Sequence, residues 1–234
     1  MSLLLRRHEP EVMDGAALDP AAHDHALSGL ARLNRWAGSD RILWPPLAEL
    51  LAGADVPLQL LDVAAGAGDV PLALLARARA AGRPLRATAL DRSATALAHA
   101  ARRAAEAGLP LSVVQGDALA PGGLPLRADV VTSSLFLHHL AEDEAVAFLR
   151  AAAAAARRLL LVADLRRGTA GLALAWSASR LATRSAVVHA DAPASVRNAF
   201  TLEEVAALAQ RAGLHGAQVV RRFPQRLLLS WRRP

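Results

Sequence analysis

The sequence contains no cysteine, no lysine and no tyrosine, and each absence excludes a kind of chemistry. Without cysteine there is no thiolate nucleophile, no disulfide and no cysteine-ligated metal. Without lysine or tyrosine there is no Schiff base and no phenolic acid. Any general base must therefore be histidine, aspartate or glutamate, and we expect no metal site.

Long apolar runs are missing as well. No uninterrupted apolar stretch reaches the length of a transmembrane helix. The basic pair Arg6–Arg7 follows a very short apolar run, which is the wrong order and length for a secretory signal. We therefore expect a cytoplasmic protein with no membrane partner. Its 234 residues, 53% of them hydrophobic, are enough for a substantial core.

Aromatic residues make up only 3% of the chain, although its formal net charge is +6. All of the basic charge comes from arginine, and the arginines are scattered or paired with acids. A nucleic-acid groove would combine a basic patch with aromatic side chains for stacking. We therefore expect a solvated surface and no nucleic-acid partner.

From residue 58 onward the hydrophobic pattern alternates between strands and helices. We predict strands over 58–63, 85–90, 111–115, 128–133 and 158–163, helices over 69–81, 93–107, 142–156 and 202–212, and a closing hairpin of strands 217–222 and 226–232. The alternation predicts an α/β fold: a Rossmann-like, doubly wound, mostly parallel seven-stranded sheet with an antiparallel C-terminal hairpin.

Two segments stand apart from this alternation. Residues 1–55 form an expected N-terminal helical cap, with an apolar stripe between Leu27 and Trp36 and a helix over 42–51. Residues 56–234 form the main domain, in which 166–200 is less regular and is expected to cover the substrate. Several helix ends carry local signals: Ser93 as an N-cap, Gly108 as a stop, and Thr201 with Glu204 as a capping box.

Small or acidic residues follow five consecutive predicted strands. They are Asp62, Asp91, Gly116-Asp117-Ala118, Ser133-Ser134 and Asp164. In open α/β sheets, ligands bind outside the carboxyl ends of the strands. Each of these residues alone is compatible with a cap for the next helix, whereas the series predicts a ligand site along one rim of the sheet.

The turn after the first strand, Leu61–Asp69 (LDVAAGAGD), indicates the kind of ligand. Small residues let a ligand approach the backbone, and a helix N-terminus follows them. The Asp91 carboxylate can accept hydrogen bonds from the two hydroxyls of a ribose. A dinucleotide fingerprint would need glycine where this chain has Pro71, and Asp62 suits a ligand that carries an ammonium group. The pattern therefore favours an adenosine cofactor with sulfonium chemistry over hydride chemistry.

The motifs LDVAAGAGD, ALDRS, QGDA and VVTSSLFLHHL together resemble a class I S-adenosylmethionine-dependent methyltransferase over about residues 58–165. The family's usual first motif is closer to LDVGCGTGD, so Ala64 and Ala65 depart from it. The resemblance implies S-adenosylmethionine as cofactor and assigns its contacts. Gly66 and Gly68 would line the methionine part, Asp91 would bind the ribose and Asp117 with Ala118 would flank the adenine; Asp62, Ala64, Arg92 and Ser134 complete the expected cofactor set.

Three shorter segments, RRHEPEVMD, LNRWAG and SVRNAFTLEEV, resemble small-molecule methyltransferases of bacterial secondary metabolism, distant relatives of the ubiquinone and menaquinone enzymes. Nucleic-acid amino-methylating enzymes usually carry an N/D-P-P-aromatic tetrapeptide after the fourth strand, where this chain has Ser133–Phe136. The resemblance thus implies a small-molecule substrate, and a homodimer is compatible with it.

His138 and His139 directly follow the fourth strand and are the candidate catalytic residues. A hydroxyl acceptor needs a base, and the near-neutral pKa of histidine suits that role. The alternative is that one or both cap or pack against the helix 142–156, and the sequence does not distinguish the two. His189 and Arg197 are candidate substrate contacts. A surface loop for His189, and an ion pair of Arg197 with Glu203 or Glu204, are equally compatible with the sequence.

The leading hypothesis is a methyltransferase acting on a small, apolar or aromatic metabolite, with O-methylation slightly favoured over C-methylation because a histidine base suits a phenol or carboxylic acid. One alternative is an RNA or protein methyltransferase, for which a continuous basic surface beside the cofactor cleft would be diagnostic. Another is a module that binds S-adenosylmethionine without catalysis.

The pair Glu11 and Asp14 would either fold over the cofactor or cap a helix.

Overall fold

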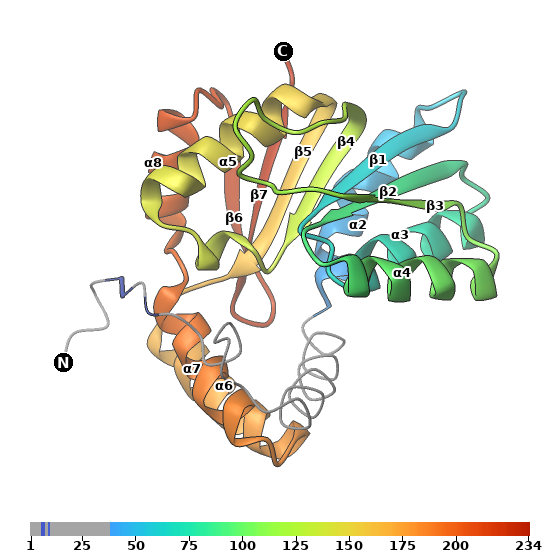
Figure 1. Ribbon diagram of the computed structural model, residues 1–234. Coiled ribbons are helices and arrows are strands. Elements are labelled where there is room, and N and C mark those ends of the chain that lie inside the picture. Colours follow the sequence, from blue (N-terminus) through green and yellow to red (C-terminus); the bar gives the residue numbers. More distant parts are fainter. Residues whose placement is uncertain (1–5, 8, 10–37) are drawn as a thin grey trace.

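The computed structural model describes residues 6, 7, 9 and 38–234, which form a layered α/β domain (Figure 1). The expected helix with the stripe Leu27–Trp36 lies outside the described residues, as does the pair Glu11 and Asp14. Helix α2 (Ser39–Ala52) is the first described helix, and it contains the segment 42–51 that the sequence predicts as helical.

A seven-stranded sheet with the order β3-β2-β1-β4-β5-β7-β6 forms the centre of the domain. Its strands are β1 (Leu58–Val63), β2 (Leu85–Asp91), β3 (Leu111–Gln115), β4 (Ala128–Ser134), β5 (Ala156–Leu165), β6 (Gln218–Arg222) and β7 (Arg226–Arg232). Strands β1 to β5 pair in parallel, whereas β7 runs antiparallel to both β5 and β6. The predicted fold class is therefore confirmed.

Helices cover both faces of the sheet, which explains why the central strands are apolar almost throughout. On one face α5 (Glu142–Ala155) and α8 (Leu202–Arg211) bury Phe148, Leu149 and Leu208 against the sheet. On the other face α2 and α3 (Asp69–Ala80) bury Leu47 and Leu74. Helix α4 (Ala94–Ala107) packs beside β2 and β3. The strand order reverses between β1 and β4, where open α/β sheets bind their ligands.

The helix ends that carry local signals lie where the sequence predicts them. The Ser93 hydroxyl accepts a hydrogen bond from the Ala96 N–H at 3.1 Å, and Gly108 ends α4 in the left-handed conformation. At α8, Thr201 and Glu204 form the predicted capping box in both directions, at 3.2 and 2.9 Å. These signals are local side-chain to backbone bonds, and for that reason the sequence shows them directly.

The segment 166–200 is more regular than the sequence predicts. It contains two packed helices, α6 (Thr169–Ala182) and α7 (Ala186–Asn198), beyond the carboxyl ends of the strands (Figure 1). The prediction missed them because α6 has no buried apolar stripe and because Asp191 and Asn198 interrupt the buried apolar residues of α7. The buried positions of α6 are Gly171 and Ser179, while its Trp176 is exposed. Helix α7 even contains an internal proline.

Candidate functional site

A pocket of about 530 Å³ opens at the carboxyl ends of the parallel strands, within the size range of ligand sites. It is lined by Ala64, Gly66, Leu90, Asp91, Arg92, Gly116, Asp117, Ala118, Leu119, Leu135, Phe136, His139, Leu140 and Glu144. Six of the nine predicted cofactor residues are in this set; Asp62, Gly68 and Ser134 are not. The structure thus brings the small and acidic strand ends together.

Asp91 connects the pocket wall to the glycine turn. One carboxylate oxygen accepts the Gly66 N–H at 2.7 Å and the other accepts the Ser93 N–H at 2.9 Å. A carboxylate has about four lone-pair sites, so both oxygens keep acceptor capacity toward the pocket. Asp91 is therefore placed to hold the turn and to accept hydroxyl donors from a ligand.

Two pocket residues with side chains adopt a backbone conformation that normally favours glycine. Ala64 has φ +57° and Leu135 has φ +56°, at the ends of β1 and β4. A left-handed conformation costs an L-residue about 1–2 kcal/mol, and such strain collects at functional sites. The family that the sequence resembles usually has glycine at the position of Ala64, so this departure carries a conformational cost.

We expect Ala64→Gly to raise the free energy of unfolding by about 1 kcal/mol, because glycine relieves this strain. Gly68→Ala should lower it by about 2–3 kcal/mol, since Gly68 has φ +75° and an added Cβ would lie 2.8 Å from the Ala100 Cβ. Urea unfolding of both variants checks the pair. Equal shifts of the same sign would contradict this account of the turn.

Asp62 lies beneath the turn, almost completely buried. Its carboxyl accepts a hydrogen bond from the Thr132 hydroxyl at 2.6 Å. Burial raises the pKa of Asp62 from 3.8 to about 7; the Thr132 bond opposes this shift and the nearby Asp91 charge adds to it. A buried carboxyl in these surroundings favours the neutral form until a cation approaches.

The raised pKa of Asp62 makes stability depend on pH. Its folded value lies above its unfolded value, so the contribution is complete below pH 4 and is lost as pH rises through about 7. Relative to wild type, Asp62→Asn should gain about 2–3 kcal/mol of unfolding free energy between pH 5 and pH 8. Urea unfolding at the two pH values measures this. Asp143→Asn, at a carboxylate that is 94% exposed, should show no such change.

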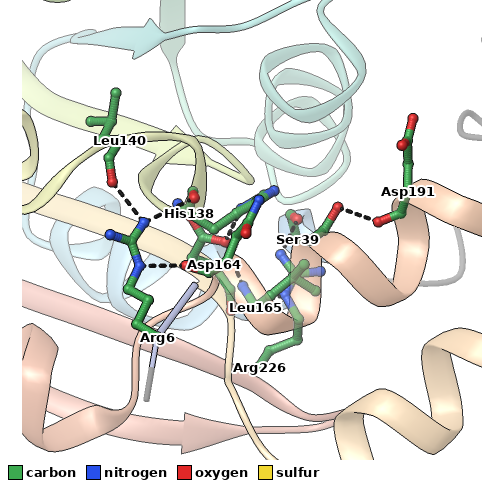
Figure 2. Close-up of polar contacts among 10 residues, drawn as sticks. Arg6, Ser39, His138, Leu140, Asp164, Leu165, Asp191 and Arg226 are labelled. Atoms are coloured by element: carbon green, nitrogen blue, oxygen red, sulfur yellow. Dashed lines mark hydrogen bonds and ion pairs between the residues drawn. The ribbon is translucent and has the colours of Figure 1, made fainter. Parts of the chain in front are cut away.

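The two candidate histidines occupy different environments, although their rings lie 4.2 Å apart. His138 belongs to the short turn η2 (Leu137–His139), is buried, and places Nδ1 2.6 Å from the Asp164 carboxylate. Its backbone N–H also donates to Asp164, at 3.2 Å (Figure 2). His139 instead lines the pocket. The contact with Asp164 holds the His138 ring in one orientation and makes Nε2 the basic nitrogen of the neutral ring.

Asp164 is held as a carboxylate by its neighbours. Burial alone would raise its pKa, but the charge and hydrogen bond of His138 outweigh burial, with help from Arg226 and the Leu165 N–H, so the pKa falls below its usual value. Arg226 donates from Nε to the Asp164 carbonyl at 3.0 Å and from Nη2 to the Ser39 hydroxyl at 2.9 Å (Figure 2). Arg226 offsets the charge of the Asp164 carboxylate while His138 is neutral. The same carboxylate stabilises His138 when that ring takes up a proton.

Arg226 is a site residue that sequence reasoning missed. It is 1% exposed, and burial lowers its pKa to about 10 while the Asp164 charge opposes that shift. Its Nη1 has no hydrogen-bond partner in the described part of the chain. The available signal was an arginine directly before the apolar run Leu227–Leu229 of a strand, since an arginine that cannot reach solvent must meet an acid or a carbonyl.

The two predicted substrate residues lie away from the pocket. His189 is in α7, not in a loop, and its Nε2 lies 2.8 Å from the Thr183 carbonyl. Among the described residues Arg197 pairs with Glu9, at 4.0 Å, and not with Glu203 or Glu204. Glu204 pairs with Arg167 at 2.9 Å, because the burial of Arg167 requires a carboxylate partner.

Every helix in the described ranges is too short or too polar to cross a lipid bilayer. Within the same ranges, no three histidine or acidic side chains gather in the manner of a metal site.

Residues 60–158 match the family described as a methyltransferase domain. No curated protein matches the chain in sequence.

Solved structures match over most of the chain. An O-methyltransferase family 2 protein from Planctomyces limnophilus, in complex with apigenin, shares 21% identity over 94% of this chain and 63% of its own, with a TM-score of 0.61. An O-methyltransferase from neocarzinostatin biosynthesis, in complex with S-adenosyl-L-homocysteine and 1,4-dihydroxy-2-naphthoic acid, shares 23% identity over 90% of this chain and 55% of its own, with a TM-score of 0.58. Magnesium protoporphyrin IX methyltransferase from Synechocystis shares 18% identity over 95% of this chain and 91% of its own, with a TM-score of 0.57.

At these sequence identities, the similarity to the three solved structures shows only that this chain shares their fold. The chain spans less than two thirds of the length of the first two of these proteins.

Proposed function

We propose that the chain uses S-adenosylmethionine to methylate a hydroxyl group of a small aromatic metabolite, with His138 as the base. The match of residues 60–158 to a methyltransferase domain supports the reaction type. The observation that carries the proposal is the buried contact of His138 with Asp164, at 2.6 Å, next to a pocket built from strand ends. Such a pair suits an acceptor that must lose a proton.

The residues present fit the cofactor. The pocket wall at Ala64, Gly66 and Ala118 is made of small residues that allow close approach, and Asp91 keeps acceptor capacity for ribose hydroxyls. When bound, S-adenosylmethionine supplies a methyl group on a positively charged sulfur. In this proposal Asp117 would contact the adenine, and the cationic amino acid moiety would favour the ionised form of Asp62.

His138 then has one task. His138 Nε2 would take the proton of the acceptor hydroxyl as its oxygen receives the methyl group, and the sulfonium would be left as a neutral thioether. Asp164 stabilises the imidazolium that forms, and Arg226 balances the Asp164 charge before the proton arrives. O-methylation is favoured over C-methylation because this arrangement provides a proton acceptor. We further propose that residues 166–200 cover the acceptor.

Charge at the pocket supports a small-molecule acceptor over RNA. Of the charged side chains that line it, Asp91, Asp117 and Glu144 are acidic and only Arg92 is basic. An RNA methyltransferase needs a basic surface along the phosphate path. The two O-methyltransferase structures with apigenin and 1,4-dihydroxy-2-naphthoic acid support a phenolic acceptor.

A transfer assay with trideuteromethyl S-adenosylmethionine tests the proposal. The acceptors are 1,4-dihydroxy-2-naphthoic acid, apigenin, simple phenols, aromatic acids and a carbon nucleophile, together with metabolite extract and total RNA. We expect the label on oxygen of at least one phenol, with the atom assigned by fragmentation mass spectrometry. Label on RNA alone, on carbon alone, or on no acceptor while the cofactor still binds, would contradict it.

A further inference from the structure

The turn that carries His138 is contacted by an arginine far away in the sequence. Arg6 lies 132 positions before His138, yet its Nη2 donates to the His138 carbonyl at 3.1 Å and to the Leu140 carbonyl at 2.6 Å. Figure 2 shows the Arg6 guanidinium directed at Leu140 and at His138. The bonds go to the backbone, so they constrain where the turn lies.

These carbonyls need a donor. A short helical turn leaves its last carbonyls without partners inside the helix, and a cation near that end is favoured by both hydrogen bonding and the local dipole. The residue after η2, Leu140, is extended, so the turn ends there. The guanidinium is suited to this role because its planar donors reach several acceptors at once, which an ammonium group does less well.

The same guanidinium also binds the end of α7. Its Nε donates to the Asn198 carbonyl at 2.5 Å, and it stacks over the Phe200 ring at 3.7 Å from the centroid. Three residues along, the Glu9 backbone pairs with the Asn198 side-chain amide in both directions, at 3.0 and 2.7 Å. Asn198 is buried, so these bonds are shielded from water. Arg6 therefore joins the N-terminal segment, the end of α7 and the histidine turn.

We propose that Arg6 is a positioning residue for His138: it fixes the turn Leu137–His139 against the end of α7, so that the contacts of Arg6 complete the site. This inference rests on the proposed function, in which His138 is the base. Misplacement of a reacting group by about 1 Å costs about 10²-fold in rate. Arg6 acts on the turn that carries the base and on the Leu140 carbonyl at the pocket wall, whereas in the proposed function Asp91 and the glycine turn bind the adenosine.

Arg7 provides a matched control, because it is the neighbouring arginine and, within the described part of the chain, pairs with Glu9 at 3.6 Å, with both side chains about half exposed. With the phenol that wild type methylates fastest, Arg6→Ala should lower kcat about 10–10²-fold, with the Kd for S-adenosylhomocysteine changed less than about threefold. The kcat of Arg6→Lys should lie between those of wild type and Arg6→Ala. Low-millimolar methylguanidinium should restore part of the Arg6→Ala activity and leave Arg7→Ala unchanged.

Hydrogen–deuterium exchange tests the same inference without an acceptor. Arg6→Ala should speed exchange in the peptides covering 137–140 and 196–200, whereas Arg7→Ala should leave both at the wild-type rate. If Arg6→Ala unfolds, the Arg6→Lys comparison takes its place. Unchanged exchange at 137–140, or a kcat within about twofold of wild type, would overturn the role of Arg6. Loss of activity in Arg6→Ala with full activity in His138→Gln would instead overturn the assignment of the base.

Discussion

His138→Gln should lower kcat for phenol methylation by a factor of about 10²–10⁴, the range that a positioned general base contributes. The Kd for S-adenosylhomocysteine should stay within about twofold, because the cofactor pocket is lined by His139 and not by His138. Steady-state kinetics and calorimetry of the same preparation measure both quantities. The rate should fall most for acceptors with a high hydroxyl pKa, which depend most on a base.

Two further variants separate the role of His138 from the roles of Asp164 and His139. Asp164→Asn should also lower kcat, because it removes the carboxylate that holds the His138 ring at 2.6 Å and stabilises its charged form. His139→Ala should act mainly on the cofactor, raising its Kd. If His139→Ala instead loses the rate and His138→Gln keeps it, then His139 is the base and the assignment made here is wrong.

Asp91→Ala should raise the Kd for S-adenosylhomocysteine about 10²-fold. Two charge-assisted hydrogen bonds to a ribose contribute about 3 kcal/mol together, which corresponds to about 10² in affinity. The variant also removes the acceptor for the Gly66 N–H at 2.7 Å, so the turn loses its anchor. Calorimetric titration measures the change, and kcat at saturating cofactor should fall far less than the affinity.

Asp129→Ala is the matched control for this experiment. Asp129 also accepts a backbone N–H, from Gln59 at 2.8 Å, but it lies near the start of β4, away from the carboxyl ends of the strands. Its removal should cost some stability and leave cofactor affinity unchanged. A similar loss of affinity in both variants would mean that Asp91 acts through folding and not through the ligand.

The fold was predictable because its signals are local or follow from a simple rule of topology. Caps such as Ser93 and the Thr201–Glu204 box involve residues three apart. Parallel strands share one carboxyl edge, so Asp91 and Asp117 were expected to come together, and they do line one pocket.

What escaped prediction depends on contacts between distant residues. Asp164 singles out His138 across 26 positions, Arg226 reaches Ser39 across 187, and Arg6 reaches Leu140 across 134. No periodicity encodes such pairs. Helices α6 and α7 were missed for a different reason: small or polar residues such as Gly171, Ser179 and Asp191 are buried in them, and these residues interrupt the usual apolar stripe.

The central claim is that the pocket behind Asp91 and the glycine turn holds S-adenosylmethionine, and calorimetry tests it most directly. Wild-type protein should bind S-adenosylmethionine and S-adenosylhomocysteine with one-to-one stoichiometry and should not bind NADH, because Pro71 occupies the place of the third glycine in a dinucleotide fingerprint. Asp91→Ala should weaken both adenosine ligands together. Tight binding of NADH with none of S-adenosylmethionine would contradict the account.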